Sequence, residues 1–313
     1  MSGILSQPYF HDEEAAFAKL ESIVWPNGPV CPKCGAMERI YTLKGVKDKK
    51  GRVRPGLKKC GHCRTQFTVR VGTVFESSHV PLHLWLQAAY LMCASKKGIS
   101  SNQLHRTLGI TLKSAWFLSH RLREAMRDGS PNLLGGEGKT VEADETYIGP
   151  PKYEYRNGKW HGKRGVGGKR VVVTLVERDG RARSIHFDKL KMKDMRAFML
   201  ANTDTQSHLR TDEAPIYKKI GTQFASHETV NHSKDEYVRG DAYTNTAEGF
   251  FSIFKRGMRG VYQHCSEQHL QRYLAEFDFR YNHRIARGFD DGSRADFALR
   301  GIVGKRLTYR DSC

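Results

Sequence analysis

The sequence lacks the features that place a protein in a membrane or a secretory pathway. No stretch of the 313 residues approaches the ~18 consecutive apolar residues of a membrane-spanning helix. The N-terminus, MSGILSQPYFHDEEAAFAKL, shows no charged segment followed by an apolar one, as a signal peptide would. No internal repeat of about 20 to 50 residues is visible, which argues against a repeat protein. We therefore expect a cytoplasmic protein with no membrane partner.

Negative charge is scarce relative to positive charge. The chain has 52 Lys and Arg against 33 Asp and Glu, a formal net charge of +19. Such an excess favours a polyanionic partner, because each neutralised phosphate releases bound counterions. A basic surface that serves solubility alone is the alternative. We expect nucleic acid as the partner, and hence association with the nucleoid.

Cysteine is sparse, and its spacing is informative. In a reducing compartment the seven cysteines are expected to bind metal or to be buried, and not to form disulfides. Four of them form two C-x2-C pairs, Cys31 with Cys34 and Cys60 with Cys63, and four thiolates suit the tetrahedral shell of one structural Zn²⁺. The segment between the pairs, LKGVKDKKGRVRPGLKK, is basic, as a ribbon in contact with phosphates would be.

A helix-turn-helix pattern follows the cysteine pairs. Residues 100–126 read SSNQLHRTLGITLKSAWFLSHRLREAM, with Gly109 at the turn and Thr111 as the expected N-cap of the second helix. An ordinary helical hairpin is the alternative. If the second helix contacts DNA, the side chains that could reach it are Lys113, His120, Arg121 and Arg123.

The pattern changes to mixed strands and helices after about residue 139, so the expected class is a multi-domain α/β fold. Asp179-Gly180 marks a hairpin turn between two of the strands. A Gly- and Lys-rich stretch is expected to form an inserted, mobile basic loop at 149–168. The domains that follow from these patterns are an N-terminal helix at 1–29, a zinc ribbon at 30–75, a helix-turn-helix region at 80–128, a catalytic domain at 138–290 and a C-terminal tail at 291–313.

Three acidic residues stand within apolar segments. Asp144 lies inside the strand-like VEADETYIG, Asp212 lies at the end of the short strand at 208–211, and Glu248 lies on a helix with an apolar face. An isolated charge is costly to bury without a counter-charge or a metal ion. Phosphodiester cleavage uses two Mg²⁺ ions about 4 Å apart, held by carboxylates from separate elements. For any one of these acids, a solvated surface charge or a helix cap is the alternative.

These motifs resemble the bacterial insertion-sequence transposases that have an RNase H-like DDE catalytic domain and an N-terminal zinc ribbon. The matching stretches extend over about residues 30–285: CPKCG with CGHC, VEADETYIG, RTDEAPIYK, and NTAEGFFSIFKRGMRGVYQHCSEQHLQRYLAEFDFRYNHR. The 35 residues between Asp212 and Glu248 match the typical spacing of that superfamily, and Lys255 follows at the usual seven. The resemblance implies an RNase H-like mixed sheet flanked by helices.

The resemblance also implies residue roles. Asp144 and Asp212 match the first two ligands of two Mg²⁺ (or Mn²⁺) ions, and Glu248 matches the third. Lys255 matches a basic residue that contacts the terminal DNA, and the adjacent Arg256 is expected to bind DNA too.

Two choices stay open at the acids. Asn245 is the alternative third residue, because some relatives use Asn, although a carboxylate holds a metal more strongly. Glu145 and Glu213 adjoin the two aspartates. Neighbouring strand residues point to opposite faces, so we expect neither glutamate to share a metal with its aspartate.

The expected function is that of a DNA transposase. It would bind the terminal inverted repeats of its element, cleave at the element ends and transfer the 3′-hydroxyls to target DNA. Its partners would be double-stranded DNA and, since two ends must be handled, further copies in a homodimer or higher oligomer. One alternative is a catalytically silent or domesticated transposase, although no carboxylate is lost. Another RNase H-like nuclease is the other alternative, against which the zinc ribbon and Lys255 argue.

Overall fold

The chain is organised as two compact units. The computed structural model describes residues 3–149, 153–162, 169–230 and 244–308. One unit comprises Met1–Arg127 and His283–Cys313, and the other comprises Asp128–Asn282. The second unit is therefore an insertion between two segments of the first.

The first unit begins with helical turns, one helix and a small antiparallel sheet. The sheet order is β1-β2-β3. Asp12 accepts a hydrogen bond from the backbone N–H of Ala15 at 2.6 Å, which begins the first α-helix at Glu13. The elements are η1 (Ile4–Ser6), η2 (Pro8–Phe10), α1 (Glu13–Val24), β1 (Ile40–Thr42), β2 (Lys58–Cys60) and β3 (Gln66–Phe67).

Three helices follow, and they include the predicted helix-turn-helix segment: α2 (Leu82–Ala94), α3 (Ser101–Leu108) and α4 (Leu112–Met126). Gly109 ends α3 with a φ of 65°, a left-handed conformation that glycine adopts without steric cost. Thr111 caps α4 as predicted, because its side chain accepts a hydrogen bond from Ser114 N at 3.2 Å. None of the described helices is long and apolar enough to cross a membrane.

The C-terminal segment is not the tail that we expected at 291–313. After η5 (Ile285–Arg287), the chain forms α9 (Asp291–Arg300), which packs against α2. Arg294 is 7% exposed and donates to the carbonyl of Cys93 at 2.8 Å. Residues 283–290 also belong to this unit, so the other unit ends at residue 282, short of the predicted boundary at 290. Residues 309–313 lie outside the described residues.

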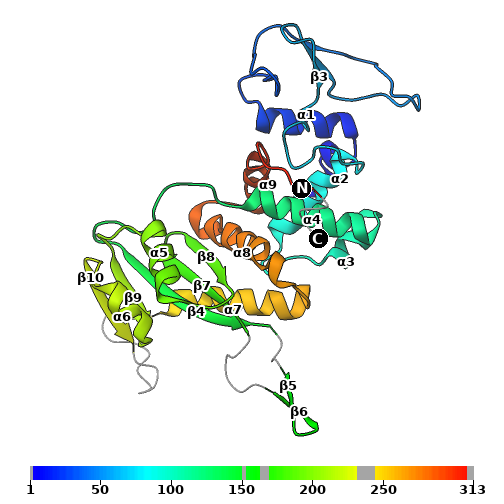
Figure 1. Cartoon of the computed structure of the whole chain (residues 1–313). Helices are drawn as coiled ribbons and strands as arrows, with labels where there is room; N and C mark the ends of the chain where they lie inside the picture. The colour runs from blue at the N-terminus through cyan, green and yellow to red at the C-terminus, as the bar shows by residue number, and fades with distance from the viewer. Residues whose placement is uncertain (1–2, 150–152, 163–168, 231–243, 309–313) are drawn as a thin grey trace. The chain divides into compact units, whose positions relative to one another are not determined.

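The second unit is built on a five-stranded mixed sheet in the order β10-β9-β4-β7-β8 (Figure 1). β7 is antiparallel to β4 and β8, whereas β9 is parallel to β4 and β10. The predicted α/β class and RNase H-like mixed sheet are confirmed. The strands are β4 (Thr140–Ile148), β7 (Arg170–Glu177), β8 (Ala182–Phe187), β9 (His208–Asp212) and β10 (Ser226–Val230).

The stretch expected as a mobile loop at 149–168 contains a hairpin. Its strands are β5 (Tyr153–Arg156) and β6 (Lys159–Gly162), which pair antiparallel. Asn157 and Gly158 connect them with φ values of 50° and 74°, as an Asn-Gly hairpin turn requires. Residues 150–152 and 163–168 of this stretch lie outside the described residues.

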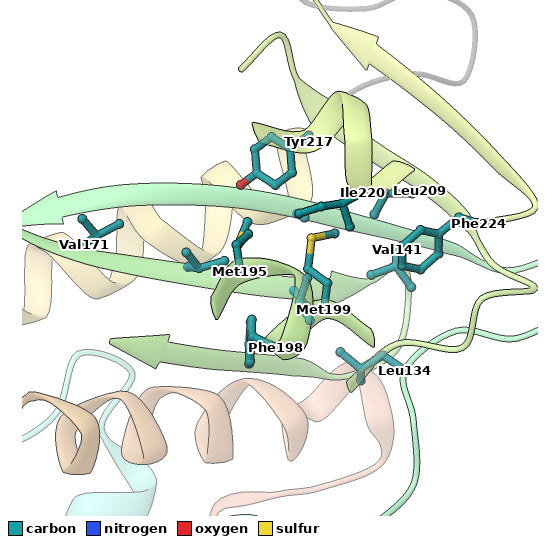
Figure 2. Packing of buried hydrophobic residues seen from close by; sticks show 13 residues of the cluster. Leu134, Val141, Val171, Met195, Phe198, Met199, Leu209, Tyr217, Ile220 and Phe224 are labelled. Atoms are coloured by element: carbon teal, nitrogen blue, oxygen red, sulfur yellow. The ribbon is translucent and has the colours of Figure 1, made fainter. Parts of the chain in front are cut away.

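Alternation along the strands separates two apolar layers. One face of the sheet packs on α5 (Met192–Asn202) and α6 (Pro215–Gly221), and Figure 2 shows this cluster. The other face packs on α7 (Asn245–Gly257), its π-helical continuation η4 (Met258–Tyr262) and α8 (Glu267–Asn282). Because neighbouring β4 residues face opposite layers, each acidic residue of β4 is assigned to one layer.

Helix α8 also supplies hydrogen bonds to the edge strand β8. Three side chains of α8, at helical spacing, bond alternate backbone groups of the strand. Asn282 accepts from Ala182 N at 2.6 Å and donates to its carbonyl at 3.0 Å. Asp278 accepts from Ser184 N at 2.8 Å, and Gln271 accepts from His186 N at 3.0 Å. These bonds occupy the edge that would otherwise be open to another strand.

The replacement Asn282→Ala tests this edge. It removes both bonds to Ala182 and leaves a buried backbone N–H without an acceptor, so we expect the unit to lose about 1–3 kcal/mol of stability in urea denaturation. The exposed Gln268→Ala on the same helix is the matched control, with an expected change within about 0.5 kcal/mol. Equal effects of the two replacements would contradict the edge-protecting role.

Candidate metal centres and DNA-binding residues

The four paired cysteines come together in the first unit. All four sulfur atoms lie within 4.8 Å of one another, and Cys31 Sγ is 3.5 Å from Cys63 Sγ. Cys34 Sγ is 3.7 Å from Cys60 Sγ. Tetrahedral zinc with Zn–S bonds of about 2.3 Å places its sulfurs about 3.8 Å apart. The donor set therefore fits one structural Zn²⁺.

Backbone turns aim these thiolates. The first pair lies in a turn closed by a hydrogen bond from Gly35 N to the Cys31 carbonyl, with Gly35 at a φ of 73°. The second pair extends from the end of β2, where Cys60 N bonds the carbonyl of Thr65 at 3.0 Å. Trp25 packs on the sulfur cluster and meets Phe67 edge to face at 5.9 Å between ring centroids. The knuckles are thus held by local geometry and by a small apolar core.

The acidic residues meet at the junction of β4 and β9. The last parallel pair between these strands is Ala143 with Thr211, so Asp144 and Asp212 are the next residues on adjacent strands. Ligand oxygens of Asp144, Glu145 and Asp212 all lie within 4.8 Å of one another. Oxygen ligands at this spacing suit a hard divalent cation such as Mg²⁺.

Asp144 is the most strongly perturbed acid of this group. Burial, with the neighbouring charge of Glu145, raises the pKa of Asp144 to about 7, although the backbone N–H of Glu145 lowers it. The charges of Asp212 and Glu248 raise it further. A divalent cation would offset the repulsion that opposes ionisation of these carboxyls.

Glu145 joins the cluster contrary to our expectation. The side chain of Glu145 does point to the opposite face of β4 from Asp144. On that face Tyr217 of α6 donates a hydrogen bond to its Oε2 at 2.5 Å. At the strand junction, however, both side chains still reach Asp212. Burial raises the pKa of Glu145, and burial also raises that of Tyr217 well above its ordinary value. Tyr217 was not identified from the sequence, since only α6 packing brings it to β4.

Glu248 lies on α7 and is not part of the 4.8 Å group formed by the other three acids. Its side chain is exposed, and Thr244 Oγ1 donates to its Oε1 at 3.2 Å. Its charge nevertheless raises the pKa of Asp144, so the two carboxylates interact. Asn245, the alternative third residue, is the exposed first residue of α7.

Lys255 and Arg256 lie two turns further along α7. Lys255 is half-buried, with its Nζ 6.0 Å from the ring centroid of Phe251, and Arg256 is exposed and donates to Ser252 at 2.6 Å. The buried side of α7 carries Phe250 and Phe254. The structure therefore leaves at least Arg256 open to a polyanion.

Three of the predicted DNA contacts on α4 are corrected by their burial. His120, Arg121 and Arg123 are 0%, 4% and 1% exposed. Arg121 donates to the carbonyl of Glu76 and lies over the ring of Trp85, and burial lowers its pKa to about 10. Lys113, in the first turn of α4, is exposed. Lys113 is the exposed basic residue of α4, because His120, Arg121 and Arg123 lie in the core of the unit.

Comparisons with known proteins agree with both centres. The ISXO2-like transposase domain matches residues 133–282, and the transposase zinc-ribbon domain matches residues 11–66. This chain belongs to the insertion-sequence DDE transposases with an N-terminal zinc ribbon. The first match contains the acidic cluster of the transposase, and the second contains all four of its paired cysteines.

One known protein and one solved structure are similar to this transposase to very different degrees. "Uncharacterized protein in transposable element ISH50" of Halobacterium salinarum is 29% identical over 285 residues, which is 87% of this chain and 91% of that protein. "Crystal structure of the Mos1 Strand Transfer Complex" covers 64% of this chain and 70% of that chain at 13% identity and a TM-score of 0.29. Nothing about this transposase follows from so low a structural similarity.

The double replacement of Cys31 and Cys34 by Ser tests the zinc site. We expect the purified wild type to hold one zinc per chain and the variant to hold much less, because two thiolates do not complete the shell. Total zinc is measured by atomic emission. The single replacement Cys93→Ser, at a buried cysteine outside the cluster, is the control and should keep its zinc. Normal zinc content in the double variant would contradict the assignment.

The raised pKa of Asp144 predicts a pH dependence. Its folded pKa of about 7 exceeds the ordinary 3.8, so in this range the folded state holds a proton that the unfolded state releases. Stability without Mg²⁺ should therefore fall as the pH rises toward 7 and level off above it. Melting temperatures between about pH 5.5 and 8 measure this, without a chelator that would remove zinc.

The replacement Asp144→Asn should flatten that fall, whereas the exposed turn residue Asp179→Asn should leave it unchanged. Other buried acids contribute to the profile, so the difference between wild type and variant is the quantity to compare. Identical profiles for Asp144→Asn and wild type would show that this carboxyl does not titrate near neutrality.

Proposed function

We propose that this transposase binds the ends of its element, cleaves there and joins the 3′-hydroxyl ends to target DNA. The observation that carries the proposal is the junction of β4 and β9, where Asp144 and Asp212 meet on adjacent strands of an RNase H-like sheet. Glu248 of α7 lies close enough for its charge to raise the pKa of Asp144. Its exposed carboxylate is open to a metal ion or DNA.

Asp144, Asp212 and Glu248 would hold two Mg²⁺ or Mn²⁺ ions, and Glu145 is a fourth oxygen donor within reach. The ions, when bound, activate the attacking oxygen and stabilise the leaving one. Tyr217 stays protonated and donates a hydrogen bond to one oxygen of Glu145. The other oxygen of Glu145 is then available to the acidic cluster. The residues that orient DNA would be Lys255 and Arg256, because they follow Glu248 along the same helix.

Basic surfaces in the first unit support DNA binding. The zinc ribbon exposes a group of cations between its two cysteine pairs: Lys44, Lys47, Lys49, Lys50, Arg52, Arg54 and Lys59. Asp48, the one acid among them, is paired with Arg52 at 2.7 Å. Lys113 at the start of α4 adds a contact where helix-turn-helix proteins reach bases. We assign the ribbon to phosphate binding and the start of α4 to recognition of the element ends.

Transposition acts on two ends of one element, so the proposal includes a homodimer or higher oligomer on DNA. Each copy would supply one acidic site. The basic surface of the zinc ribbon lies on a different unit from the acidic cluster, so end binding and cleavage can be separated by mutation.

The replacements Asp144→Asn and Asp212→Asn test the active site. We expect each to lower cleavage of an end-containing duplex in Mg²⁺ by at least about 1,000-fold, because the metal site loses a charged ligand. DNA binding, measured by fluorescence anisotropy, should stay within a few-fold of wild type. Strand transfer of pre-cleaved ends is measured in parallel. Full cleavage by either variant would overturn the assignment.

The third ligand is decided by Glu248→Gln and Asn245→Ala in the same assay. We expect the first to behave like the aspartate variants and the second to retain most activity. The reverse order would make Asn245 the ligand. A wild type that binds the ends but never cleaves them would instead support a silent, DNA-binding role. Cleavage of branched junctions without preference for ends would favour a different nuclease.

A further inference from the structure

A third acid of β4, Glu142, is completely buried and is not part of the acidic cluster. Its carboxylate receives hydrogen bonds from two elements. Arg178 Nε donates to Oε1 at 2.8 Å, from the segment that follows β7. Thr246 donates to both oxygens, through its backbone N–H and its hydroxyl, each at 2.9 Å. Ala247 N donates to Oε2 at 3.0 Å.

These bonds place Glu142 at the N-terminus of α7. The second and third residues of this helix, Thr246 and Ala247, have backbone N–H groups with no partner within the helix. Thr244, at the usual capping position, makes no side-chain bond to the helix backbone and instead bonds Glu248. A carboxylate from the sheet therefore performs the capping, and its negative charge also suits the positive end of the helix dipole.

The position of Glu142 links two of the proposed metal ligands. Glu142 and Asp144 are two residues apart on β4, so they lie on the same face of the sheet. Glu248 directly follows Ala247, which bonds Glu142. The strand that carries the first acid is thus joined to the first turn of the helix that carries the third acid. Rotation or translation of α7 along the sheet would break these bonds.

We propose that Glu142 is a positioning residue that sets the placement of Glu248 relative to Asp144 and so completes the second metal site. This inference rests on the proposed function, in which both acids hold metal. Arg178 neutralises the buried charge of Glu142, so Glu142 remains a capping carboxylate while Asp144, two residues on, remains available to a cation. In this proposal Glu142 and Arg178 are not metal ligands themselves.

An isosteric replacement, Glu142→Gln, tests the proposal. An amide offers one acceptor oxygen, whereas the carboxylate accepts from donors on both sides. The amide NH2 must therefore face either Arg178 or the two backbone N–H groups. Mutation of such outer residues typically costs 10–100-fold in metal affinity or activity. We expect the Mg²⁺ concentration for half-maximal cleavage to rise at least about tenfold, with DNA binding unchanged.

Metal binding gives a second readout that does not require activity. Calorimetric titration of zinc-loaded protein with Mn²⁺ should show two sites in the wild type. In Glu142→Gln, one of them should weaken by about 10- to 100-fold. Thr246→Val, which removes only the hydroxyl bond and keeps the backbone bonds, should shift the same affinity in the same direction by less. It also serves if Glu142→Gln does not fold.

The matched control is Asp278→Asn. Asp278 is also buried, and it also accepts a backbone and a hydroxyl bond, but from Ser184 of β8. We expect this variant to melt at a lower temperature while its Mg²⁺ dependence and Mn²⁺ affinities stay those of the wild type.

The outcomes separate the two claims. If Glu142→Gln and Asp278→Asn both lose stability and neither changes metal affinity, Glu142 is only a structural anchor and the inference is wrong. If the wild type binds two Mn²⁺ ions but does not cleave, cleavage fails as a function while the Mn²⁺ titration of the variants still decides the role of Glu142. A wild type that neither binds Mn²⁺ nor cleaves overturns both.

Discussion

The acidic site depends on the parallel pairing of β4 with β9. This pairing aligns Ala143 with Thr211, and it therefore brings Asp144 and Asp212 side by side although 67 residues separate them in the chain. A shift of the pairing by one residue would turn one aspartate to the opposite face. The apolar residues on both faces of β4 oppose such a shift, because each would leave its layer. Hydrophobic patterning in the strands thus fixes the spacing of the charged groups.

Two acids of β4, Glu142 and Asp144, lie in the interior of the unit, and their carboxyl groups have different surroundings. Glu142 forms an ion pair with Arg178 and accepts hydrogen bonds from backbone N–H groups of α7, so it can be fully buried. Asp144 accepts a hydrogen bond from the backbone N–H of Glu145, and its burial and the neighbouring acids raise its pKa. One carboxylate is satisfied internally, and the other is left for a ligand from outside. This contrast separates a framework acid from a reactive one within three residues of strand.

Local patterns predicted the elements that depend on nearby residues. The cysteine pairs, the N-cap at Thr111 and the strand around Asp144 follow from spacing and side-chain type, and the structure contains them. The predictions that failed depended on distant packing. Arg121 belongs to a basic run in the sequence, but α4 is surrounded by other helices and the side chain is buried. The segment after residue 290 forms α9, whose partner is α2 about 200 residues earlier in the chain.

The sequence by itself determined the class of chemistry, because thiolates and carboxylates at these spacings suit Zn²⁺ and hard divalent cations whatever their surroundings. It also indicated several helix starts and strands, such as the N-cap at Thr111, since capping and alternation are local, but it missed the β5–β6 hairpin and α9. Only the tertiary structure decided which acids share a site. It brought Glu145 into the cluster with Asp144 and Asp212, set Glu248 apart on α7, and gave Glu142 a capping role. These assignments depend on strand register and helix placement, which arise from contacts between residues far apart in the chain.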